Sequence, residues 1–565
     1  TTGSIDASAR SAAGVKAKLD GTFEIVDDEA KDGLAFGGVI ASNLILVDVA
    51  TTLTGTVLDA DGDVSLLARN AGSITAENTV SVKGTGTAVG VMLAFNTVGW
   101  QAQNILYAAV DALIGTSIGT EQVAQAVLSV TGGGITAGGS IAFAAENEQQ
   151  IAATINMVAT SAAAAGAGVV LASNRVNARS RALVDYAFGS SGISAGGDLT
   201  IGATDTAGIT SEITMEAAGA TTGVGLIFVR NDVRGGVSAE VNAVALTADG
   251  NIGLSAIGAA SIEAKASGDV KIAAQEEDAP EEEKASGSAV AGLIASNMVL
   301  GGATAQIQNT TVTAGGGIDV LADMLTLVRA ENTMKAEASG TAVGLTLAFN
   351  SVGWDSSNIF QQMADALLAT SIGSSPGINT VARLWNVAFS AGGAVRVLAG
   401  GTDVEAERRG ALIDAAIDAS ASTSGSSAGV GIVLTSNRVK TSATAEIDTD
   451  QVNRDRDVVG SLEVAARDTA AISGKTTMAA GSGGGAAVGL TIVLNDVQGG
   501  VSALIDDMDL QTQNDLTIAA DQQSSINAEL SGSVTSAPSE DAEDSNTLSF
   551  GGVIATNVVR SNSSA

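Results

Sequence analysis

Apolar and polar residues alternate with a period of two along most of the chain, and short glycine segments interrupt this alternation. Five of these segments share one form, in the strings ITAGGSIAFAA, ISAGGDLTIGA, LTADGNIGLSA, VTAGGGIDVLA and FSAGGAVRVLA. Alternation of this kind is typical of half-buried strands, and glycine supplies the positive φ that a tight corner needs. The pattern predicts strands joined by glycine corners. A phosphate-binding loop is disfavoured, because no segment ends in the Gly-Lys-Ser/Thr of a P-loop.

An apolar stretch that ends in asparagine recurs along the whole chain. The strings include IASN, LAFN, LASN, FVRN and IVLN, and in eight of nine copies a valine follows two residues later. Stacked amides at one position of a repeat hydrogen-bond along the stack and satisfy buried polar groups. We therefore predict a structural row of nine residues: Asn43, Asn96, Asn174, Asn231, Asn297, Asn350, Asn437, Asn495 and Asn557.

The spacing of these asparagines is itself periodic. The gaps are 53, 78, 57 and 66 residues and then 53, 87, 58 and 62, so four units make one super-repeat. We expect residues 1–37 to end a preceding super-repeat, 38–291 and 292–551 to form two complete ones, and 552–565 to start a third. Both ends match the interior of a super-repeat, which is expected either of a piece of a longer array or of a subunit whose ends complete each other.

Short strands, glycine corners and a fixed period predict an all-β fold, an elongated β-solenoid resembling a parallel β-helix, with short helical insertions. In such a fold each coil buries its inward face only by stacking on its neighbours. With coils of about 20–25 residues and strands ~4.8 Å apart, the chain would form a rod roughly 100–130 Å long. A string of tandem β-sandwich modules is the alternative.

The two longest gaps contain insertions, at about residues 100–130 and 354–388, whose apolar residues follow helical spacing. One interpretation is that each helix folds back and caps the flank of the solenoid. The other is that its apolar face docks onto a neighbouring molecule, because large exposed apolar patches mark association sites. The candidate association surface comprises Trp100, Ile105, Tyr107, Leu113, Trp354, Phe360, Met363, Leu367 and Trp385.

Acidic segments precede three units of the same type. Clustered carboxylates can bind Ca²⁺ through oxygen ligands, but a charge run is more often a solvated loop, and the three segments share no ligand spacing. We therefore predict no cofactor, with Ca²⁺ as the one ion to test. The weak candidate ligands are Asp27, Asp28, Glu29, Glu276, Glu277, Asp278, Glu540, Asp541, Glu543 and Asp544.

Composition removes several classes of function. The 565 residues contain no His and no Cys, which excludes imidazole bases, thiol catalysis and disulfides. A net charge of −34 disfavours nucleic acid, because phosphate binding needs Lys and Arg. No apolar run is long enough to form a transmembrane helix. Nine equivalent units also argue against catalysis, which needs one site, so no catalytic residue is predicted.

The TAGGxIxVxA corners and the AGVGIVLTSNRV stretch resemble the repeat regions of giant bacterial exoproteins, the filamentous-haemagglutinin-like proteins and large surface adhesins. The resemblance covers the whole chain through repeat style, without a diagnostic site. It implies a secreted protein with a long right-handed β-helix that serves in adhesion, matrix or appendage building.

Together these observations predict a non-enzymatic, extracellular structural protein of the bacterial cell surface or matrix. It would form a stiff shaft or self-assemble into a filament, with copies of itself, end to end or laterally, as its partners. An adhesin stalk that binds a host or carbohydrate surface is one alternative. A β-helical polysaccharide-processing enzyme is another, although no unique carboxylate pair stands out in the sequence.

Overall fold

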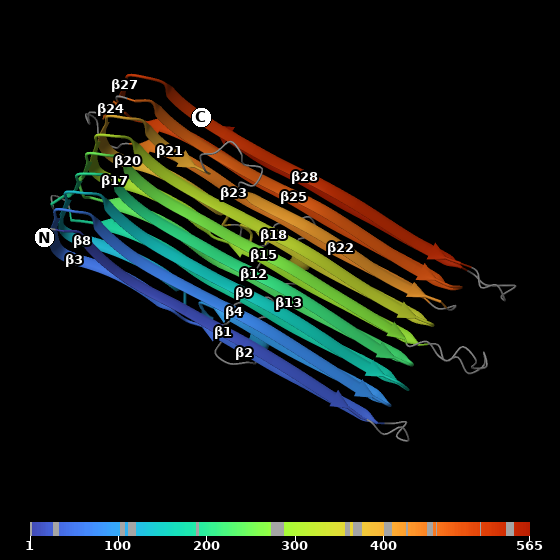
Figure 1. Ribbon diagram of the computed structural model, residues 1–565. Helices are drawn as coiled ribbons and strands as arrows, with labels where there is room; N and C mark the ends of the chain where they lie inside the picture. The colour runs from blue at the N-terminus through green and yellow to red at the C-terminus, as the bar shows by residue number, and fades with distance from the viewer. Residues whose placement is uncertain are drawn as a thin grey trace.

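The computed structural model describes residues 3–25, 33–101, 108–110, 113, 120–187, 191–272, 287–355, 362–364, 376–400, 410–424, 428–448, 456–458, 460–508, 510–537 and 547–565. The chain winds as a flattened coil whose long strands form two facing parallel sheets (Figure 1). Successive coils stack in chain order, with the first and last coils at opposite ends of the stack. The predicted all-β solenoid is confirmed.

Sheet A forms one of the two layers, and every pairing in it is parallel. Most of its strands are 20 or 21 residues long. In one coil two shorter strands replace the long one. The strands of sheet A are β1 (Ile5–Glu24), β4 (Val64–Gly84), β9 (Ile141–Ser161), β12 (Leu199–Gly219), β15 (Ile252–Ile272), β18 (Ile318–Ala338), β21 (Val395–Ala399), β22 (Ala411–Thr423), β25 (Leu462–Ser482) and β28 (Leu516–Ser536).

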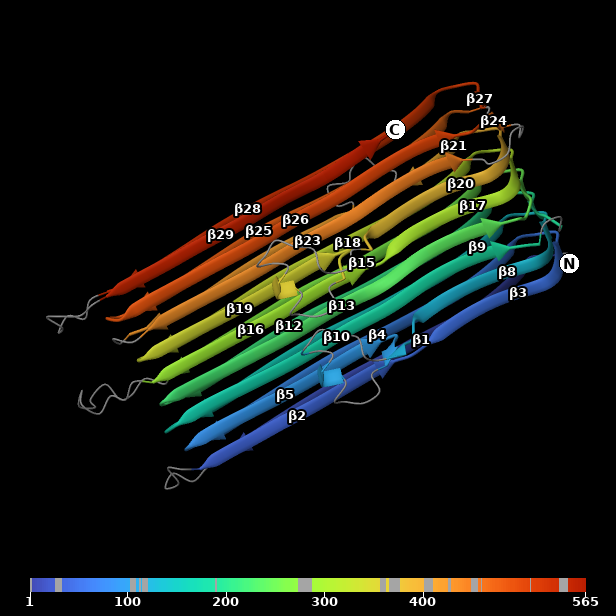
Figure 2. The same cartoon turned by 180° about the vertical axis from the view of Figure 1, so that it is seen from behind.

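Sheet B forms the opposite layer, which faces the viewer in Figure 2. Its long strands are β2 (Leu34–Ile45), β3 (Asp48–Ala60), β5 (Thr87–Val98), β8 (Ala124–Ala137), β10 (Ala165–Asp185), β13 (Thr222–Asn242), β16 (Ser288–Leu300), β17 (Gly302–Ala314), β19 (Thr341–Val352), β20 (Ile378–Ala391), β23 (Gly429–Asp448), β26 (Ala486–Asp506) and β29 (Leu548–Ser564). Short strands precede the corner: β11 (Ile193–Ala195), β14 (Leu246–Ala248), β24 (Arg456–Val458) and β27 (Gln511–Thr512). An antiparallel pair, β6 (Trp100–Gln101) and β7 (Thr120–Glu121), lies outside both sheets.

Each asparagine-to-asparagine unit is one full coil of the solenoid. Asn43 pairs with Asn96 and Asn96 with Asn174 in adjacent parallel strands, and the same register continues to Asn557. The predicted coil of about 20–25 residues is therefore wrong, because one coil contains two long strands. The alternative of tandem sandwich modules is also wrong, because both sheets continue through every unit.

The large coil changes the predicted dimensions. Sheet A has nine layers along the axis, and strands ~4.8 Å apart make that stack roughly 40 Å tall. A strand of 21 residues extends for roughly 70 Å across the stack. The described coils are thus wider than their stack is tall, and the expected length of ~100–130 Å is wrong.

Small and β-branched residues fill the interior because the two sheets alternate inward and outward side chains. The first residue of each sheet A strand faces inward, and Val64, Ile141, Leu199 and Leu462 have no exposed surface. Each such burial stabilises the fold by about 1.5–3 kcal/mol. In the last coil the equivalent residue, Leu516, is 49% exposed because no coil covers it.

The glycine corners lie where predicted but for a different reason. Gly138, Gly196, Gly315 and Gly392 do not have a positive φ. A Cβ atom at Gly196 would lie 2.4 Å from the carbonyl oxygen of Gly138, and one at Gly392 would lie 2.2 Å from that of Gly315. These corners need glycine because adjacent coils pass too close for a side chain.

Both insertions are shorter than expected, and each interrupts a strand of sheet B. β5 and β8 together pair along β10, and β19 and β20 together pair along β23. The predicted limits of 130 and 388 are wrong, because β8 starts at Ala124 and β20 at Ile378. Short helical segments at 108–110 and 362–364 lie over the outer side of sheet B (Figure 2). In the described parts of the chain, no helix is long and apolar enough to cross a membrane.

Candidate association surfaces

The nine asparagines form one continuous ladder along the axis. In each of eight steps the Nδ2 of one residue donates to the Oδ1 of the next at 2.8–2.9 Å. The seven interior members are buried, each at most 1% exposed. The ladder has a direction, because every amide donates toward the C-terminal end. Within the described chain, the Oδ1 of Asn43 and the Nδ2 of Asn557 have no partner at the two ends.

A second, shorter ladder lies at the bend before the short strands, and the sequence interpretation missed it. Asn386 donates to Asn309 at 3.0 Å, Asn309 to Asn242 at 3.0 Å, and Asn242 to Asp185 at 2.7 Å. Asn309 and Asn386 have φ values of 55° and 53°, a left-handed conformation that asparagine tolerates better than most residues. The available signal was an Asn or Asp ahead of four of the five glycine corners; the corner at Gly138 has none.

The inserted segments leave the sheet at a repeated Val-Gly-Trp sequence. Gly99 and Gly353 have φ values of 68° and 70°, which strongly favour glycine there. The tryptophans that follow are buried, with Trp100 5% and Trp354 4% exposed. The guanidinium carbon of Arg175 lies 3.8 Å from the centroid of the Trp100 ring, and that of Arg438 lies 4.6 Å from that of Trp354.

Burial of both tryptophans corrects the predicted association surface, since these two residues anchor each insertion to its own sheet. Met363 also packs inward, against Leu347, Phe349 and Leu434. Leu113 is 44% exposed, and Trp385 lies half-buried on β20 beneath the Arg383 guanidinium. Ile105, Tyr107, Phe360 and Leu367 lie outside the described residues, so their part of the prediction stays untested.

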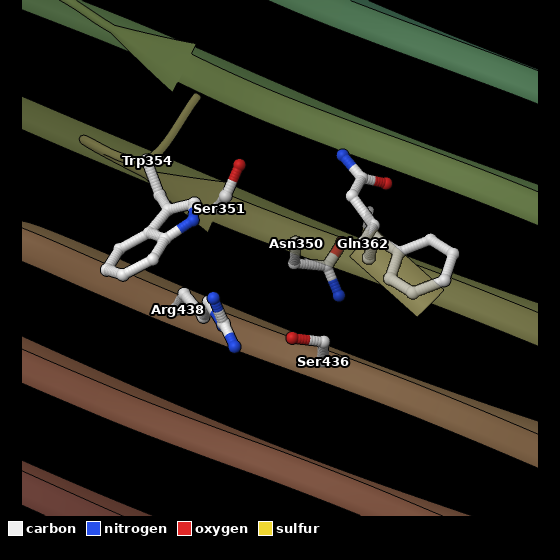
Figure 3. Close-up of a pocket in the computed structure, with 7 residues that line it drawn as sticks. Asn350, Ser351, Trp354, Gln362, Ser436 and Arg438 are labelled. Carbon is white, nitrogen blue, oxygen red and sulfur yellow. The ribbon is translucent and has the colours of Figure 1, made fainter. Parts of the chain in front are cut away.

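A small cavity lies beside the second insertion (Figure 3). It is bordered by Trp354, Asn350, Ser436 and Arg438, and its volume of about 20 Å³ is that of a single water molecule. Gln362 closes it by donating from Nε2 to the Ser296 hydroxyl at 3.4 Å. The cavity is too small for a substrate or cofactor.

Beneath the first insertion a carboxylate is surrounded by arginines. Asp232, 1% exposed, lies 3.1 Å from Arg230, 3.1 Å from Arg234 and 3.4 Å from Arg175. Burial alone would raise the pKa of Asp232, but the three guanidinium groups outweigh it and lower this pKa to about 2. Arg234 also contacts Asp355 at 3.6 Å. The cluster thus ties two coils of sheet B to the start of the second insertion.

Two carboxyl groups on sheet A are buried without an ion pair at contact distance to any described residue. Burial raises the pKa of Asp205 to about 7, although Asn147 donates to it at 2.8 Å and the charge of Arg179 opposes the shift. Burial also raises the pKa of Asp468, which accepts hydrogen bonds from Thr441 and Gln522. Four layers separate the two groups, or roughly 19 Å. They do not form the close carboxylate pair of a glycosidase.

The candidate calcium ligands lie in segments outside the described residues. These are Asp27, Asp28, Glu29, Glu276, Glu277, Asp278, Glu540, Asp541, Glu543 and Asp544. The described residues contain no group of three or more Asp, Glu, His or Cys that could hold a metal ion. An acidic corner at Asp63 has another role, because its Oδ1 accepts the backbone N–H of Ser140 in the next coil at 2.7 Å.

Large apolar side chains are exposed mainly on the first and last coils. Leu34, Phe36 and Ile40 of β2 are 59–64% exposed, and Leu548, Phe550 and Ile554 of β29 are 54–62% exposed. These two sets occupy the same positions of the repeat, in LAFGGVIASN and LSFGGVIATN. The two ends are therefore the principal apolar surfaces of the described chain. Comparison with protein-family models, with curated proteins and with solved structures finds no match to this chain.

Proposed function

We propose that the chain is a non-enzymatic structural protein of the bacterial cell surface or extracellular matrix. Its coils would build a stiff shaft or filament by continuing the same stacking beyond one chain. The observation that carries this proposal is the unbroken asparagine ladder, which runs through all nine units of the described chain. A ladder of identical steps suits a load-bearing body better than a catalytic site.

Stiffness follows from the width of each layer. Bending the stack would open main-chain hydrogen bonds along strands of up to 21 residues, and would also break amide bonds of the ladder. Each buried amide left without a partner costs about 1–3 kcal/mol. Concerted loss of so many bonds is unfavourable, so the stack resists bending as one body.

An extracellular location is supported by composition rather than by a targeting signal. The chain has no Cys, so its stability is independent of the redox state of the surroundings. The net charge of −34 keeps the outer faces hydrated and mutually repulsive. Such repulsion favours growth along the axis over lateral clumping.

Electron microscopy of the purified protein, combined with small-angle X-ray scattering, tests the proposal. We expect slabs roughly 40 Å tall and 70 Å wide, or filaments built from them. A panel of acidic and neutral polysaccharides should show no release of reducing ends. Flexible strings of globules, or turnover of any polysaccharide, would contradict the structural role.

A further inference from the structure

We propose that the outer face of sheet B pairs with the same face of a second copy, so that two stacks lie side by side. The contact surface is the half of each sheet B strand that precedes the asparagine ladder, and we call it the apolar panel. In Figure 2 the panel is the half of sheet B that carries the labels β5, β16 and β19. The inference rests on the proposed structural function and names the surface through which two shafts associate.

Three outward columns of side chains make up the panel in the seven coils from β5 to β26. The middle column runs in register from Val89 to Val488 and is valine at every level except Ala167. The column nearer the ladder, from Val91 to Leu490, holds only Val, Leu, Ile and one Gly. The column at the strand starts holds only Thr, Ser and Ala. The panel therefore contains no charged residue.

The panel strands are apolar on both faces, unlike the strands of sheet A. In β13, Leu226 lies on the outer face, while the next residue, Ile227, is fully buried in the core. Near-continuous apolar runs are typical of parallel strands that are covered on both sides, whereas alternation is typical of strands with one solvated face. The outer face of sheet A carries exposed ion pairs, such as Lys265 with Glu331 at 3.8 Å. The contrast indicates that an apolar surface covers the panel.

The inserted segments of the chain pack on the column next to the panel. Ala109 packs in a cluster with Leu171, and Met363 packs in a cluster with Leu347. The middle column of the panel stays accessible, with Val290 38% exposed and the other valines half-buried by their neighbours in the sheet. The panel is thus a flat apolar strip that the insertions border on one side.

The area of the panel matches that of a stable dimer interface. Neighbouring layers lie ~4.8 Å apart and neighbouring outward columns ~6.8 Å apart, so three columns over seven layers cover roughly 700 Å². Specific protein interfaces bury about 800 Å² per partner. Pairing through the panel would also avoid the cost of desolvating charges, because the panel holds none.

Charge favours a second copy over a membrane as the occupant. A chain with a net charge of −34 is repelled by anionic lipid surfaces. A flat strip of valines is complementary to itself, and facing sheets pack ~10 Å apart. Charged residues lie on the other outer faces, including the second half of sheet B, where Arg181 pairs with Glu240 at 2.9 Å. The excess of acidic residues makes those faces repel, so association ends at two stacks.

The position of the insertions selects the symmetry of the pair. Each insertion leaves sheet B at Gly99 or Gly353, just beyond the ladder. A two-fold axis along the strands would leave the insertions between the two sheets and hold the panels apart. A two-fold axis parallel to the stack overlaps only the panels, and the insertions of the two copies lie on opposite sides of the overlap. With this axis each coil faces the same coil of the second copy, so Val224 faces Val224.

A double substitution in the middle column tests the surface. Val224→Lys with Val343→Lys should weaken side-by-side pairing at least tenfold in a sedimentation series, with circular dichroism reporting the fold. Electron micrographs distinguish paired stacks from stacks that grow along the axis. The matched control is Ile257→Lys with Leu325→Lys, two aliphatic residues of the outer face of sheet A that are 41% and 40% exposed. This control should pair as the wild type does.

The nearly isosteric change Val224→Thr with Val343→Thr keeps the test valid if the lysines disturb folding. It should weaken pairing by a smaller factor than the lysines do. Wild-type protein that shows only single stacks, or a folded lysine variant that still forms paired stacks, would overturn the proposal.

Cross-linking tests the symmetry, because the chain has no Cys and a single substitution gives one reactive site. Val224→Cys and Val430→Cys should each form covalent dimers with themselves, through a bismaleimide that spans the ~10 Å between facing sheets. A mixture of the two should give few links from Val224→Cys to Val430→Cys, because three layers, or roughly 14 Å, separate these positions along the stack. Leu325→Cys on sheet A should not cross-link. Links between different coils in place of same-coil links would refute the stated axis.

Flotation with neutral phosphatidylcholine vesicles tests the competing occupant. Wild-type protein that binds these vesicles, and loses binding with Val224→Lys and Val343→Lys, would assign the panel to a lipid surface and overturn pairing. Single rigid stacks without polysaccharide turnover would overturn pairing and leave the structural function standing. Turnover of a polysaccharide would refute the structural function whether or not the stacks pair.

Discussion

The side-chain amide of Asn96 donates to Asn174 at 2.8 Å, the distance at which Asn43 donates to Asn96, although 78 residues separate the first pair and 53 the second. The additional residues of the longer gap lie in the inserted segment, which leaves at Gly99 and returns at β8. Insertions therefore lengthen the chain without changing the rise of the coil. A coil can carry an insertion on its outer face because the side chains on its inner face keep the same positions from coil to coil.

The ladder should be cooperative in its interior and dispensable at its end. Asn231→Ala removes an acceptor for Asn174 and a donor for both Asn297 and the buried Ser211 hydroxyl. We expect a loss of about 2–4 kcal/mol in the free energy of unfolding, measured by urea denaturation. Asn557→Ala, at the exposed end, should cost less than about 1 kcal/mol. Equal losses at both positions would contradict a load-bearing ladder.

Stability should fall as pH rises from about 4 to about 7 because of Asp205. Its pKa is raised to about 7 in the folded protein, whereas the unfolded side chain has its usual value of 3.8. Between these values the folded state holds a proton that the unfolded state has lost, so raising the pH favours unfolding.

The corresponding variant is Asp205→Asn, which should be more stable than the wild type at pH 8 and should lose this part of the pH dependence. One pKa unit corresponds to about 1.4 kcal/mol, so the effect should amount to a few kcal/mol. Urea denaturation at pH 5 and pH 8 measures it, with the exposed Asp6→Asn as control. If the free energy of unfolding of Asp205→Asn depends on pH as that of the wild type does, this carboxyl is ionised in the folded state.

The arginine cluster should depend on its single carboxylate. Asp232→Asn leaves Arg175, Arg230 and Arg234 without their shared counter-charge, and breaking a buried ion pair in this way costs about 3–5 kcal/mol. Glu240→Gln removes the half-exposed partner of Arg181 and should cost less than about 1 kcal/mol. Denaturation at pH 7 compares the two. A small effect at Asp232 would mean that water reaches the cluster.

Trp100 should anchor the insertion rather than mediate association. Trp100→Ala removes a buried ring and its contact with Arg175, and we expect about 3–5 kcal/mol of destabilisation together with faster proteolysis between residues 102 and 119. Trp100→Phe should restore part of the lost stability and part of the resistance to proteolysis. Sedimentation of the folded variant should match that of the wild type. A selective loss of self-association with normal stability would restore the docking interpretation for this residue.

Metal removal should leave the coils intact. The described core is closed by side chains and main-chain bonds without a metal-binding cluster. We expect the melting temperature to be unchanged in excess chelator. A decrease of several degrees that Ca²⁺ reverses and Mg²⁺ does not would identify the acidic segments as calcium sites.

Part of the architecture was predictable because it repeats in sequence. Alternation of apolar and polar residues with a period of two indicates strands, and the recurrence of Asn43, Asn96 and Asn174 at equivalent positions of the repeat indicates that the units stack. The length of a coil was not predictable, since a recurring glycine pair marks only one of its bends. The opposite bend varies in sequence: it is Thr85 and Gly86 between β4 and β5, but three glycines, 483–485, between β25 and β26.

The candidate association surfaces were also only partly predictable from the sequence. An apolar helical face with tryptophans has the same pattern whether it caps its own sheet or binds another molecule. Only the contact between the Arg175 guanidinium and the Trp100 ring, 75 residues apart in sequence, shows that the inserted segment caps its own sheet. The Asp232 cluster was only partly visible in the sequence, because Arg230 and Arg234 flank Asp232 on the same strand whereas Arg175 comes from the neighbouring coil.

The sequence by itself determined that this chain stacks equivalent units, because backbone alternation and the asparagine period are local properties of each unit. Tertiary structure decided how wide each coil is, which aromatic rings are buried and which apolar residues stay exposed at the two ends. Those outcomes depend on which neighbour covers each side chain, and burial is a property of the stack rather than of the segment.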